Sequence, residues 1–348
     1  MIRGLTAGAA AIVCAAVLAS AAAVAQNSCP QRGDLDTAYC DDNGDLLADA
    51  PRDARRLKNP ETLFFTNSPL DDPAVFNRLM QPFVDYLATC SGRRVRYYDV
   101  YSSAAAIEAM RSGRMHLGTM SSGDTAFAVN VAGAIPVGIR GDASGPQGYQ
   151  LWMIVRRDSP YQKLGDLKGK RIAHATPSSN SGNLAPRALF PAEGLVPDRD
   201  YKVAYSGKHE NSISGVASGD YDAAPVANDI LVRMAERGVV KMEDFRIIWK
   251  SRNFPPGGLS MAHDLAPALA QKIRDCTFSF RYPPEMQKGF QGADRWVPID
   301  YRKDWEIVRV VAQTSGQSFT RAAFEAEKAR SDKARAEAAS SSAAAKKP

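Results

Sequence analysis

The chain has 348 residues, a formal net charge of +6 and 45% hydrophobic residues. This length exceeds what one simple hydrophobic core needs, so two lobes are expected. Lys and Arg are scattered rather than gathered into a stripe, which excludes nucleic acid as an expected partner.

The first residues are typical of a secretory signal peptide. Arg3 precedes a run rich in Ala, Val and Leu, and Ala23–Ala25 (AVA) precedes Gln26, as in an A-x-A cleavage site. We therefore expect residues 1–25 to be a cleaved signal peptide and the mature protein to be soluble in the periplasm. A retained membrane anchor is the alternative, and no later stretch approaches the ~20 apolar residues that a spanning helix requires.

Four cysteines follow this segment: Cys29, Cys40, Cys90 and Cys276. An even number in an oxidising compartment predicts disulfides, and four cysteines allow three pairings. We favour Cys29–Cys40, because both lie in the Gly- and Asp-rich residues 26–60, which have little core of their own. Cys90–Cys276 is then the second bond, with two separate buried thiols as the alternative. No C-x-x-C motif or Cys/His cluster suggests zinc.

The stretch CDDNGDLLAD (residues 40–49) shares part of its spacing with a calcium-binding loop. Four residues fall at the first, third, fifth and ninth ligand positions, namely Asp41, Asn43, Asp45 and Asp49. Gly44 does not match the glycine of the sixth position, and Arg52 replaces the bidentate glutamate. Two interpretations stay open: a structural calcium ion, or solvated turn acids held by the Cys29–Cys40 bond.

From Glu61 onward, predicted strands and helices alternate. In the first part, strands are predicted at 62–68, 93–100 and 114–120, and helices at 73–92 and 102–113. In the second part, strands are predicted at 149–160, 170–175, 200–207, 221–227 and 245–251, and helices at 210–220 and 229–238. The Pro- and Gly-rich residues 252–265 mark a second passage between the two parts.

This alternation predicts an α/β fold with two lobes, each a mainly parallel sheet flanked by helices, joined by two hinge crossings. Lobe 1 is expected at 61–147 plus 253–318, lobe 2 at 148–252, and a charged helical or disordered tail at 319–348. A cleft between two lobes is the usual location for a small ligand.

The stretch ATPSSNSGNLAPRALF (residues 175–190) crowds hydroxyl and amide side chains at the start of a helical pattern. One capping residue is enough for a helix, so four in a row suggest a further role. The first N–H groups of a helix lack intrahelical acceptors and carry partial positive charge, and they can therefore bind an oxyanion. The alternative is ordinary capping.

A longer stretch, WMIVRRDSPYQKLGDLKGKRIAHATPSSNSGNLAPRALF, resembles the core signature of periplasmic substrate-binding proteins of phosphonate, phosphite and phosphate ABC importers. Two further stretches resemble family segments: SGKHENSISGVASGDYDAAPVANDIL and PFVDYLATCSGRRVRYYDVYSSAAAIEAMRSGRMHLG. The resemblance covers roughly residues 60–310. It implies a two-lobed, hinge-closing, monomeric receptor without catalysis, which delivers a tetrahedral oxyanion to a permease in the inner membrane.

The resemblance also implies which residues contact the ligand. Ser179, Asn180 and Ser181 take the places of the oxyanion contacts, and His209 stands where the family has a histidine; a histidine that caps the helix beginning near Asn211 is the alternative. We add residues in the turn after the first strand and at the first crossing. The candidate ligand-binding residues are therefore Ser179, Asn180, Ser181, His209, Asn67, Ser103, Thr119, Tyr149 and Asn228.

Three features depart from the family pattern. Ser103 occupies a position where tyrosine is common, Thr119 and Thr125 fall where aromatic residues often occur, and Ala227–Asn228 stands where an acid or amide on a strand is expected. These departures disfavour an aminoalkyl phosphonate, whose amine requires a carboxylate.

Two other classes of function are weighed against a transport receptor. The first is a family member that has been recruited to another cargo, such as a metal or metal complex, or to a partner protein. A phosphatase-like enzyme with Ser179 as nucleophile is the second, although H-E-x-x-H, G-x-S-x-G and P-loop motifs are missing. No cofactor is expected apart from the calcium ion considered above.

Overall fold

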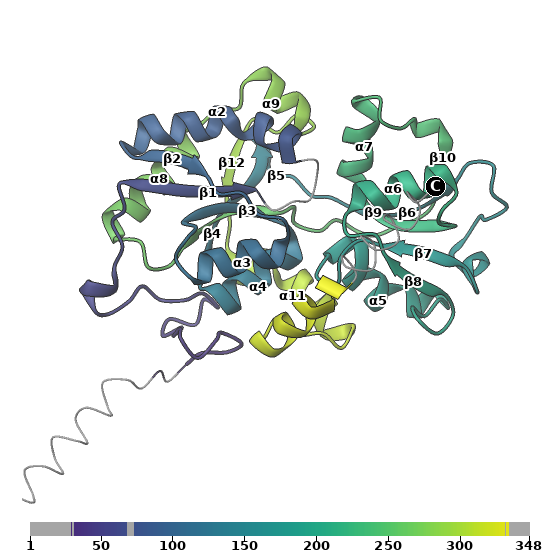
Figure 1. Ribbon diagram of the computed structural model, residues 1–348, viewed down its shortest axis with the longest axis horizontal. Helices are drawn as coiled ribbons and strands as arrows, with labels where there is room; N and C mark the ends of the chain where they lie inside the picture. Colours follow the sequence, from purple (N-terminus) through teal and green to yellow (C-terminus); the bar gives the residue numbers. More distant parts are fainter. Residues whose placement is uncertain (1–28, 30, 68–72, 331, 334–348) are drawn as a thin grey trace, which may run out of the picture.

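The computed structural model describes residues 29, 31–67, 73–330 and 332–333, so the predicted signal peptide lies outside the described residues. The chain forms two bodies side by side, each built on one sheet with helices on its faces (Figure 1). We call the body with the seven-stranded sheet lobe 1 and the body with the five-stranded sheet lobe 2. Within the described ranges, none of the helices has the length and apolarity needed to cross a membrane.

Lobe 1 has the strand order β12-β4-β11-β3-β1-β2, with β5 paired to β4. Its strands are β1 (Thr62–Asn67), β2 (Arg94–Tyr97), β3 (Leu117–Met120), β4 (Ala134–Asp142), β5 (Gly145–Pro146), β11 (Gly258–Ala262) and β12 (Arg295–Pro298). The helices that accompany them are η1 (Ala54–Arg56), α2 (Pro73–Ser91), α3 (Ser103–Arg111), α4 (Ser122–Ala132), α8 (Pro267–Ser279), α9 (Pro284–Gly289) and α10 (Tyr301–Asp304). Helix α11 (Glu306–Thr314) contacts α4 of lobe 1 and also η3 and α5 of lobe 2.

Lobe 2 has the strand order β10-β6-β9-β7-β8. Its strands are β6 (Leu151–Arg156), β7 (Arg171–His174), β8 (Lys202–Tyr205), β9 (Ala223–Ala227) and β10 (Phe245–Lys250). Its helices are η2 (Leu164–Leu167), η3 (Asn180–Leu184), α5 (Ala185–Leu189), η4 (Phe190–Glu193), α6 (His209–Ser218), α7 (Asn228–Glu236) and η5 (Met242–Asp244).

The α/β class and the two-lobed architecture are confirmed, but the sheets are mixed rather than mainly parallel. β1 pairs in parallel with β2 and β3, and β7 pairs in parallel with β8 and β9. The strands next to the crossings run the other way: β4 and β11 are antiparallel to each other, and β6 is antiparallel to β9 and β10. The antiparallel pairings are thus concentrated where the chain leaves one sheet and enters the other.

The two crossings between the lobes contact each other. They run from β5 to β6 and from β10 to β11, and the predicted second passage is shorter than expected because β11 occupies part of it. Tyr149 and Phe254 exchange backbone hydrogen bonds, with N···O distances of 3.0 and 2.7 Å. The crossings therefore form one paired connection. The precise lobe boundaries stay a prediction.

Helix α4 lies in the interior of lobe 1, and every one of its residues is buried. Ser121 caps its first turn by accepting a hydrogen bond from the Asp124 N–H (3.1 Å), and Gly133 ends it in the left-handed conformation at φ 62°, a common helix terminator. Because no face of α4 meets solvent, the amphipathic pattern that marks the other helices is missing here.

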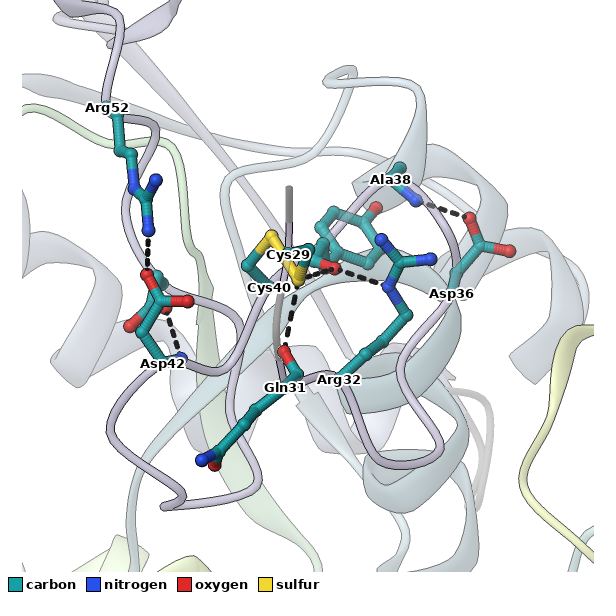
Figure 2. Close-up of a disulfide and its surroundings, with 10 residues drawn as sticks. Cys29, Gln31, Arg32, Asp36, Ala38, Cys40, Asp42 and Arg52 are labelled. Carbon is teal, nitrogen blue, oxygen red and sulfur yellow. Dashed lines mark hydrogen bonds and ion pairs between the residues drawn. A yellow bond between two sulfur atoms is a disulfide. The ribbon is translucent and has the colours of Figure 1, made fainter. Parts of the chain in front are cut away.

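Both predicted disulfides are confirmed. Cys90–Cys276 joins α2 to α8, and Cys29–Cys40 closes a loop in the N-terminal segment. Figure 2 shows that loop, in which the Arg32 guanidinium donates to the Tyr39 carbonyl (3.1 Å). Tyr39 is buried, and its hydroxyl donates to the carbonyl of Val131 near the C-terminal end of α4 (3.4 Å). The N-terminal segment is therefore packed onto lobe 1.

The acidic residues of this segment accept hydrogen bonds from backbone N–H groups. The Asp41 carboxylate, which is buried, accepts from the N–H groups of Asp45 and Leu46, both at 3.0 Å. Asp49 accepts from the Asp42 N–H at 2.7 Å, and Arg52 pairs with the Asp42 carboxylate (Figure 2). Within the described ranges there is no group of three or more His, Cys, Asp or Glu side chains that could hold a metal ion. These contacts occupy the Asp41 and Asp49 carboxylates with backbone donors, and calcium binding stays a prediction.

The C-terminal segment begins with a helix that packs on lobe 1. Residues 321–330 are helical. The rings of Phe319 and Phe324 are buried against Phe127 of α4, with centroid distances of 5.0 and 5.8 Å. Arg321 also pairs with Asp36 of the N-terminal segment. Both flanks of the chain therefore meet on α4.

Candidate ligand-binding site

The serine-rich stretch enters its helix through a wide first turn. Ser179 is the N-cap, and its hydroxyl accepts a hydrogen bond from the Gly182 N–H (3.1 Å). The N–H groups of Asn183 and Leu184 both donate to the Ser179 carbonyl, at 3.0 and 2.9 Å. The first turn is consequently a π-type turn, η3, and the α-helix α5 starts only at Ala185.

A buried network below η3 holds this turn in place. The Asn183 Oδ1 atom accepts from His174 Nδ1 (2.9 Å) and Arg187 Nε (3.0 Å), while its Nδ2 atom donates to the Pro177 carbonyl (2.7 Å). The Tyr201 hydroxyl lies 2.8 Å from the other ring nitrogen of His174. Because these polar groups are satisfied by one another, the turn keeps one conformation.

The N–H groups of Asn180 and Ser181 have no acceptor among the described residues. They belong to the first turn of η3, whose N–H groups cannot reach an intrahelical carbonyl. The side chains of Asn180 and Ser181 are also buried. The turn thus presents two backbone donors, a hydroxyl and an amide at one place.

A second serine pair faces this turn from lobe 1. Ser121 and Ser122 begin α4, directly after β3. The Ser122 hydroxyl donates to the Pro255 carbonyl in the second crossing (2.7 Å), and the buried Trp305 indole donates to the Ser122 carbonyl (2.8 Å). These two contacts fix the start of α4 against the second crossing and against Trp305.

His209 is the first residue of α6 and reaches the serines from the other side. Its Nε2 atom lies 3.2 Å from the Ser179 hydroxyl and 3.4 Å from the Ser181 hydroxyl, and its Nδ1 atom accepts from the Ala227 N–H at 3.4 Å. Burial lowers the pKa of His209 to about 4. The imidazole is therefore neutral at pH 7, with its proton on Nε2 directed at the two serines.

Tyr149 connects the crossing to both lobes. Its hydroxyl accepts from Asn180 Nδ2 of lobe 2 (2.9 Å) and lies 3.4 Å from the Ser122 hydroxyl of lobe 1. Burial raises the pKa of Tyr149, so the phenol stays protonated. The Asn180 Oδ1 atom has no hydrogen-bond partner in the described part of the chain, although it is buried. A buried acceptor of this kind costs about 1–3 kcal/mol unless a donor reaches it.

These groups surround one cavity of about 50 Å³. It is lined by Ser121, Ser122, Tyr149, Ser179, Asn180, Ser181, His209, Ala227, Asp229, Ile230 and Gly257. One water molecule needs about 10–15 Å³ of such space, so the cavity accommodates a group of only a few non-hydrogen atoms. The starts of α4, η3, α6 and α7 all contribute to its wall. Four helix starts provide partial positive charge and suit an anion.

The structure brings together five of the predicted ligand residues and places four elsewhere. Ser179, Asn180, Ser181, His209 and Tyr149 line the cavity. The remaining four lie elsewhere. The Thr119 hydroxyl donates to the side-chain oxygen of Asn67 (2.8 Å). The Asn228 side chain accepts from the Gln150 N–H (2.6 Å), and Ser103 is the first residue of α3. None of these four lines the cavity, and ligand contacts of all nine stay a prediction.

Sequence reasoning missed the lining residues of lobe 1 and the acidic residue of α7. Ser121 and Ser122 follow a short strand and precede a helix, which is the same signal that marks Ser179. Asp229 directly follows the predicted Asn228. The side chain of Asn228 turns toward the first crossing, whereas Asp229 reaches the cavity.

Comparison with known proteins decides the family. The sequence profile of one family, described as the periplasmic substrate-binding protein of a phosphonate ABC transporter, matches residues 65–305. The chain belongs to this family. It is therefore the periplasmic substrate-binding component of a phosphonate-type ABC transporter, with a small ligand and a transporter partner, and the family is not enzymatic.

Individual relatives are similar over most of this chain. The phosphonates-binding periplasmic protein of Escherichia coli K12 is 25% identical over 233 residues, which is 66% of this chain and 69% of that protein. Among solved structures, PhnD1 of Prochlorococcus marinus MIT 9301, in complex with methylphosphonate, superposes with a TM-score of 0.66 at 16% identity, covering 75% of this chain and all of that one. A phosphonate-transporter binding protein of Pseudomonas aeruginosa gives 0.65 at 20% identity, covering 81% and 99%. Both share the two-lobed fold.

Proposed function

We propose that this protein binds one tetrahedral phosphorus oxyanion (a phosphonate, phosphite or phosphate) in the cavity between the lobes. The observation that carries the proposal is the convergence of four helix starts on a small cavity that is also lined by Asn180 and Ser181, whose N–H groups have no acceptor among the described residues. Donors fixed in advance bind an oxyanion without a cost for reorganising them. The hydroxyls of Ser179 and Ser181 and the Nε2–H of His209 add neutral donors, which suits a carrier that must release its cargo.

The unpaired Oδ1 atom of Asn180 adds a preference for ligands that carry a proton. A singly protonated phosphonate, phosphite or phosphate can donate P–OH to this oxygen, whereas sulfate carries no proton near neutral pH. Satisfying a buried acceptor is worth about 1–3 kcal/mol. We therefore expect sulfate to bind roughly 10- to 100-fold more weakly than methylphosphonate.

The test is isothermal titration of the purified mature protein with methylphosphonate, phosphite, phosphate and sulfate. Ser181→Ala removes one donor to a charged group, worth about 1.5–3 kcal/mol, and should weaken methylphosphonate binding roughly 10- to 100-fold. Ser279→Ala, an exposed serine at the end of α8, is the matched control and should bind like the wild type. If no phosphorus oxyanion binds to the folded wild-type protein, the proposal is wrong. The alternative, a family member that binds another cargo, is then favoured.

We also infer that the protein is exported by a cleaved signal peptide and delivers its ligand as a monomer to an inner-membrane permease. The AVA sequence before Gln26 supports the cleavage, and the family supports the permease. Intact-mass measurement of the periplasmic protein should give a chain that begins at Gln26. A mass that includes residues 1–25 would contradict this inference.

A further inference from the structure

An acidic side chain lines the proposed anion cavity. Asp229 lies in the first turn of α7, and its side chain is 17% exposed. A lone carboxylate at this place would repel an anion and would attract a cationic group on a ligand. The effect of Asp229 on the ligand therefore depends on what already neutralises its charge.

Two guanidinium groups meet the Asp229 carboxylate. Arg233, one helical turn further along α7, lies 2.8 Å from its Oδ2 atom, and Arg140 lies 3.5 Å from the same atom. Burial alone would raise the pKa of Asp229, but Arg233 and Arg140 together hold it below its ordinary value. The Asp229 carboxylate that lines the cavity is therefore already paired with two guanidinium groups.

Arg140 reaches Asp229 from the other lobe. It belongs to β4 in lobe 1, its guanidinium lies 4.6 Å from the centre of the Phe290 ring, and its side chain is 13% exposed. The neighbouring Gln291 donates from Nε2 to the Asp229 carbonyl (3.0 Å). Stacking on a ring fixes the plane of a guanidinium, so Arg140 is held where the two lobes meet.

We propose that Arg140 is a specificity-determining residue: by occupying the Asp229 carboxylate, it restricts the cavity to phosphorus oxyanions with a small uncharged substituent and rejects those that carry an ammonium group. An ammonium group at this wall would have to displace a guanidinium from the Asp229 carboxylate before it could pair with it. The inference rests on the proposed function. It deepens that function by stating which phosphonates are excluded.

The experiment compares two ligands of equal size and different charge. Aminomethylphosphonate and ethylphosphonate differ in one terminal group, NH₃⁺ against CH₃, so the ratio of their Kd values isolates the ammonium. Methylphosphonate is titrated in parallel. The wild type should bind ethylphosphonate at least tenfold more tightly than aminomethylphosphonate. Arg140→Gln should reduce this ratio roughly tenfold, because the ammonium then competes with Arg233 alone for the Asp229 carboxylate.

Two further variants separate charge from packing. Arg140→Lys keeps the positive charge and should retain the wild-type ratio. Arg171→Gln removes a guanidinium that also stacks on a ring, that of Tyr221 at 4.8 Å, without lining the cavity, and should likewise leave the ratio unchanged. Melting temperatures confirm that each variant is folded.

The outcomes distinguish this inference from the function on which it rests. If methylphosphonate does not bind to the wild type, the proposed function fails. If methylphosphonate binds but Arg140→Gln keeps the wild-type ratio, the role of Arg140 is refuted. If ethylphosphonate and aminomethylphosphonate are both rejected while methylphosphonate binds, size rather than charge sets the limit, and the role of Arg140 is again refuted.

Discussion

His209 is a buried histidine whose tautomer is set by the backbone. The Ala227 N–H donates to Nδ1, which places the proton on Nε2 beside the hydroxyls of Ser179 and Ser181. A neutral imidazole can donate this one hydrogen bond to an anion without bringing a permanent charge into the cavity. When a dianion binds, its charge favours the imidazolium form and raises the pKa of His209.

The low pKa of His209 makes the unliganded protein less stable in acid. Its pKa is about 4 in the folded chain and 6.5 when unperturbed. Between these values the unfolded state binds a proton that the folded state does not, so the free energy of unfolding falls as the pH drops from about 6.5 to about 4. At about 1.4 kcal/mol per pKa unit, the loss from His209 between pH 7.5 and pH 5 is about 2 kcal/mol.

Urea unfolding of the wild type and of His209→Gln at the two pH values checks this prediction. The variant should lose about 2 kcal/mol less than the wild type over this interval. His174, whose pKa burial also lowers to about 4, contributes equally to both proteins and cancels. An identical pH dependence in the variant would show that His209 does not titrate in this way.

The side chains that could be predicted from the sequence are those whose role is local. Ser179 to Ser181 stand at the start of a helix, and a helix start is recognised within a few neighbouring residues. Asp229 and Arg140 are 89 residues apart, and their contact requires the two lobes to face each other. The sequence around each residue contains no pattern that predicts how the two lobes face each other.

At the level of elements, α4 links the site to the flanks of the chain. Its first turn lines the cavity through Ser122. Its last turn accepts hydrogen bonds from the N-terminal segment, as the Asp36 N–H donates to the Asn130 carbonyl at 2.7 Å. The family match covers residues 65–305. The two segments that pack on α4, the N-terminal segment and the helix at 321–330, both lie outside it. The flanks therefore add stability to an element that the site requires.

The two disulfides should differ in what they contribute to stability. Cys29–Cys40 closes a loop of 11 residues and Cys90–Cys276 one of 186. The chain-entropy account gives about 3 and about 5 kcal/mol for loops of these lengths. Replacing Cys90 and Cys276 by Ala should therefore lower the free energy of unfolding more than replacing Cys29 and Cys40.

Urea unfolding of the two double variants measures the difference. Because the Cys29–Cys40 loop lies away from the cavity, its removal should leave methylphosphonate affinity within a factor of about three. Equal destabilisation by the two double variants, or a larger loss from the short loop, would contradict the prediction.

The elements could be predicted where their pattern is periodic. Strands such as β1 and helices such as α2 lie where the alternation places them. The strand directions could not be predicted, because they depend on where the chain passes between the sheets. Helix α4 shows no periodicity because it is buried on every side.

At the scale of the whole molecule, the lobes touch beside the cavity. The Ser178 hydroxyl of lobe 2 donates to the Asp124 carboxylate of lobe 1 (2.8 Å). Gly123 in the first turn of α4 lies so close that an added Cβ would stand 2.1 Å from the Ser178 carbonyl oxygen. Only glycine permits this approach. A hinge motion that encloses a ligand would have to end in this contact.

Gly123→Ala should prevent full closure without removing any donor from the cavity. The added methyl group meets a backbone carbonyl, which can move only if the lobes part. Overpacking of this kind costs about 1–3 kcal/mol, so methylphosphonate affinity should fall roughly tenfold or more. Small-angle scattering should show compaction of the wild type on adding methylphosphonate and a smaller change in the variant.

Gly165→Ala is the matched control. Its Cβ would meet nothing within 4 Å, and its backbone does not adopt positive φ. This variant should bind and compact like the wild type. If Gly123→Ala also binds and compacts normally, the contact between Gly123 and Ser178 does not limit closure.

The packing of both flanks on α4 also has a practical consequence for building a sensor from this protein. Cys29 and the helix at 321–330 both belong to the lobe 1 side of the molecule. Fluorescent reporters attached beside Cys29 and at residue 330 would therefore lie on the same body, and the distance between them would scarcely change when a ligand is captured. A responsive sensor would need one reporter inserted in an exposed turn of lobe 2, such as the one at Gly238, so that its distance to a terminal reporter follows the closing of the molecule.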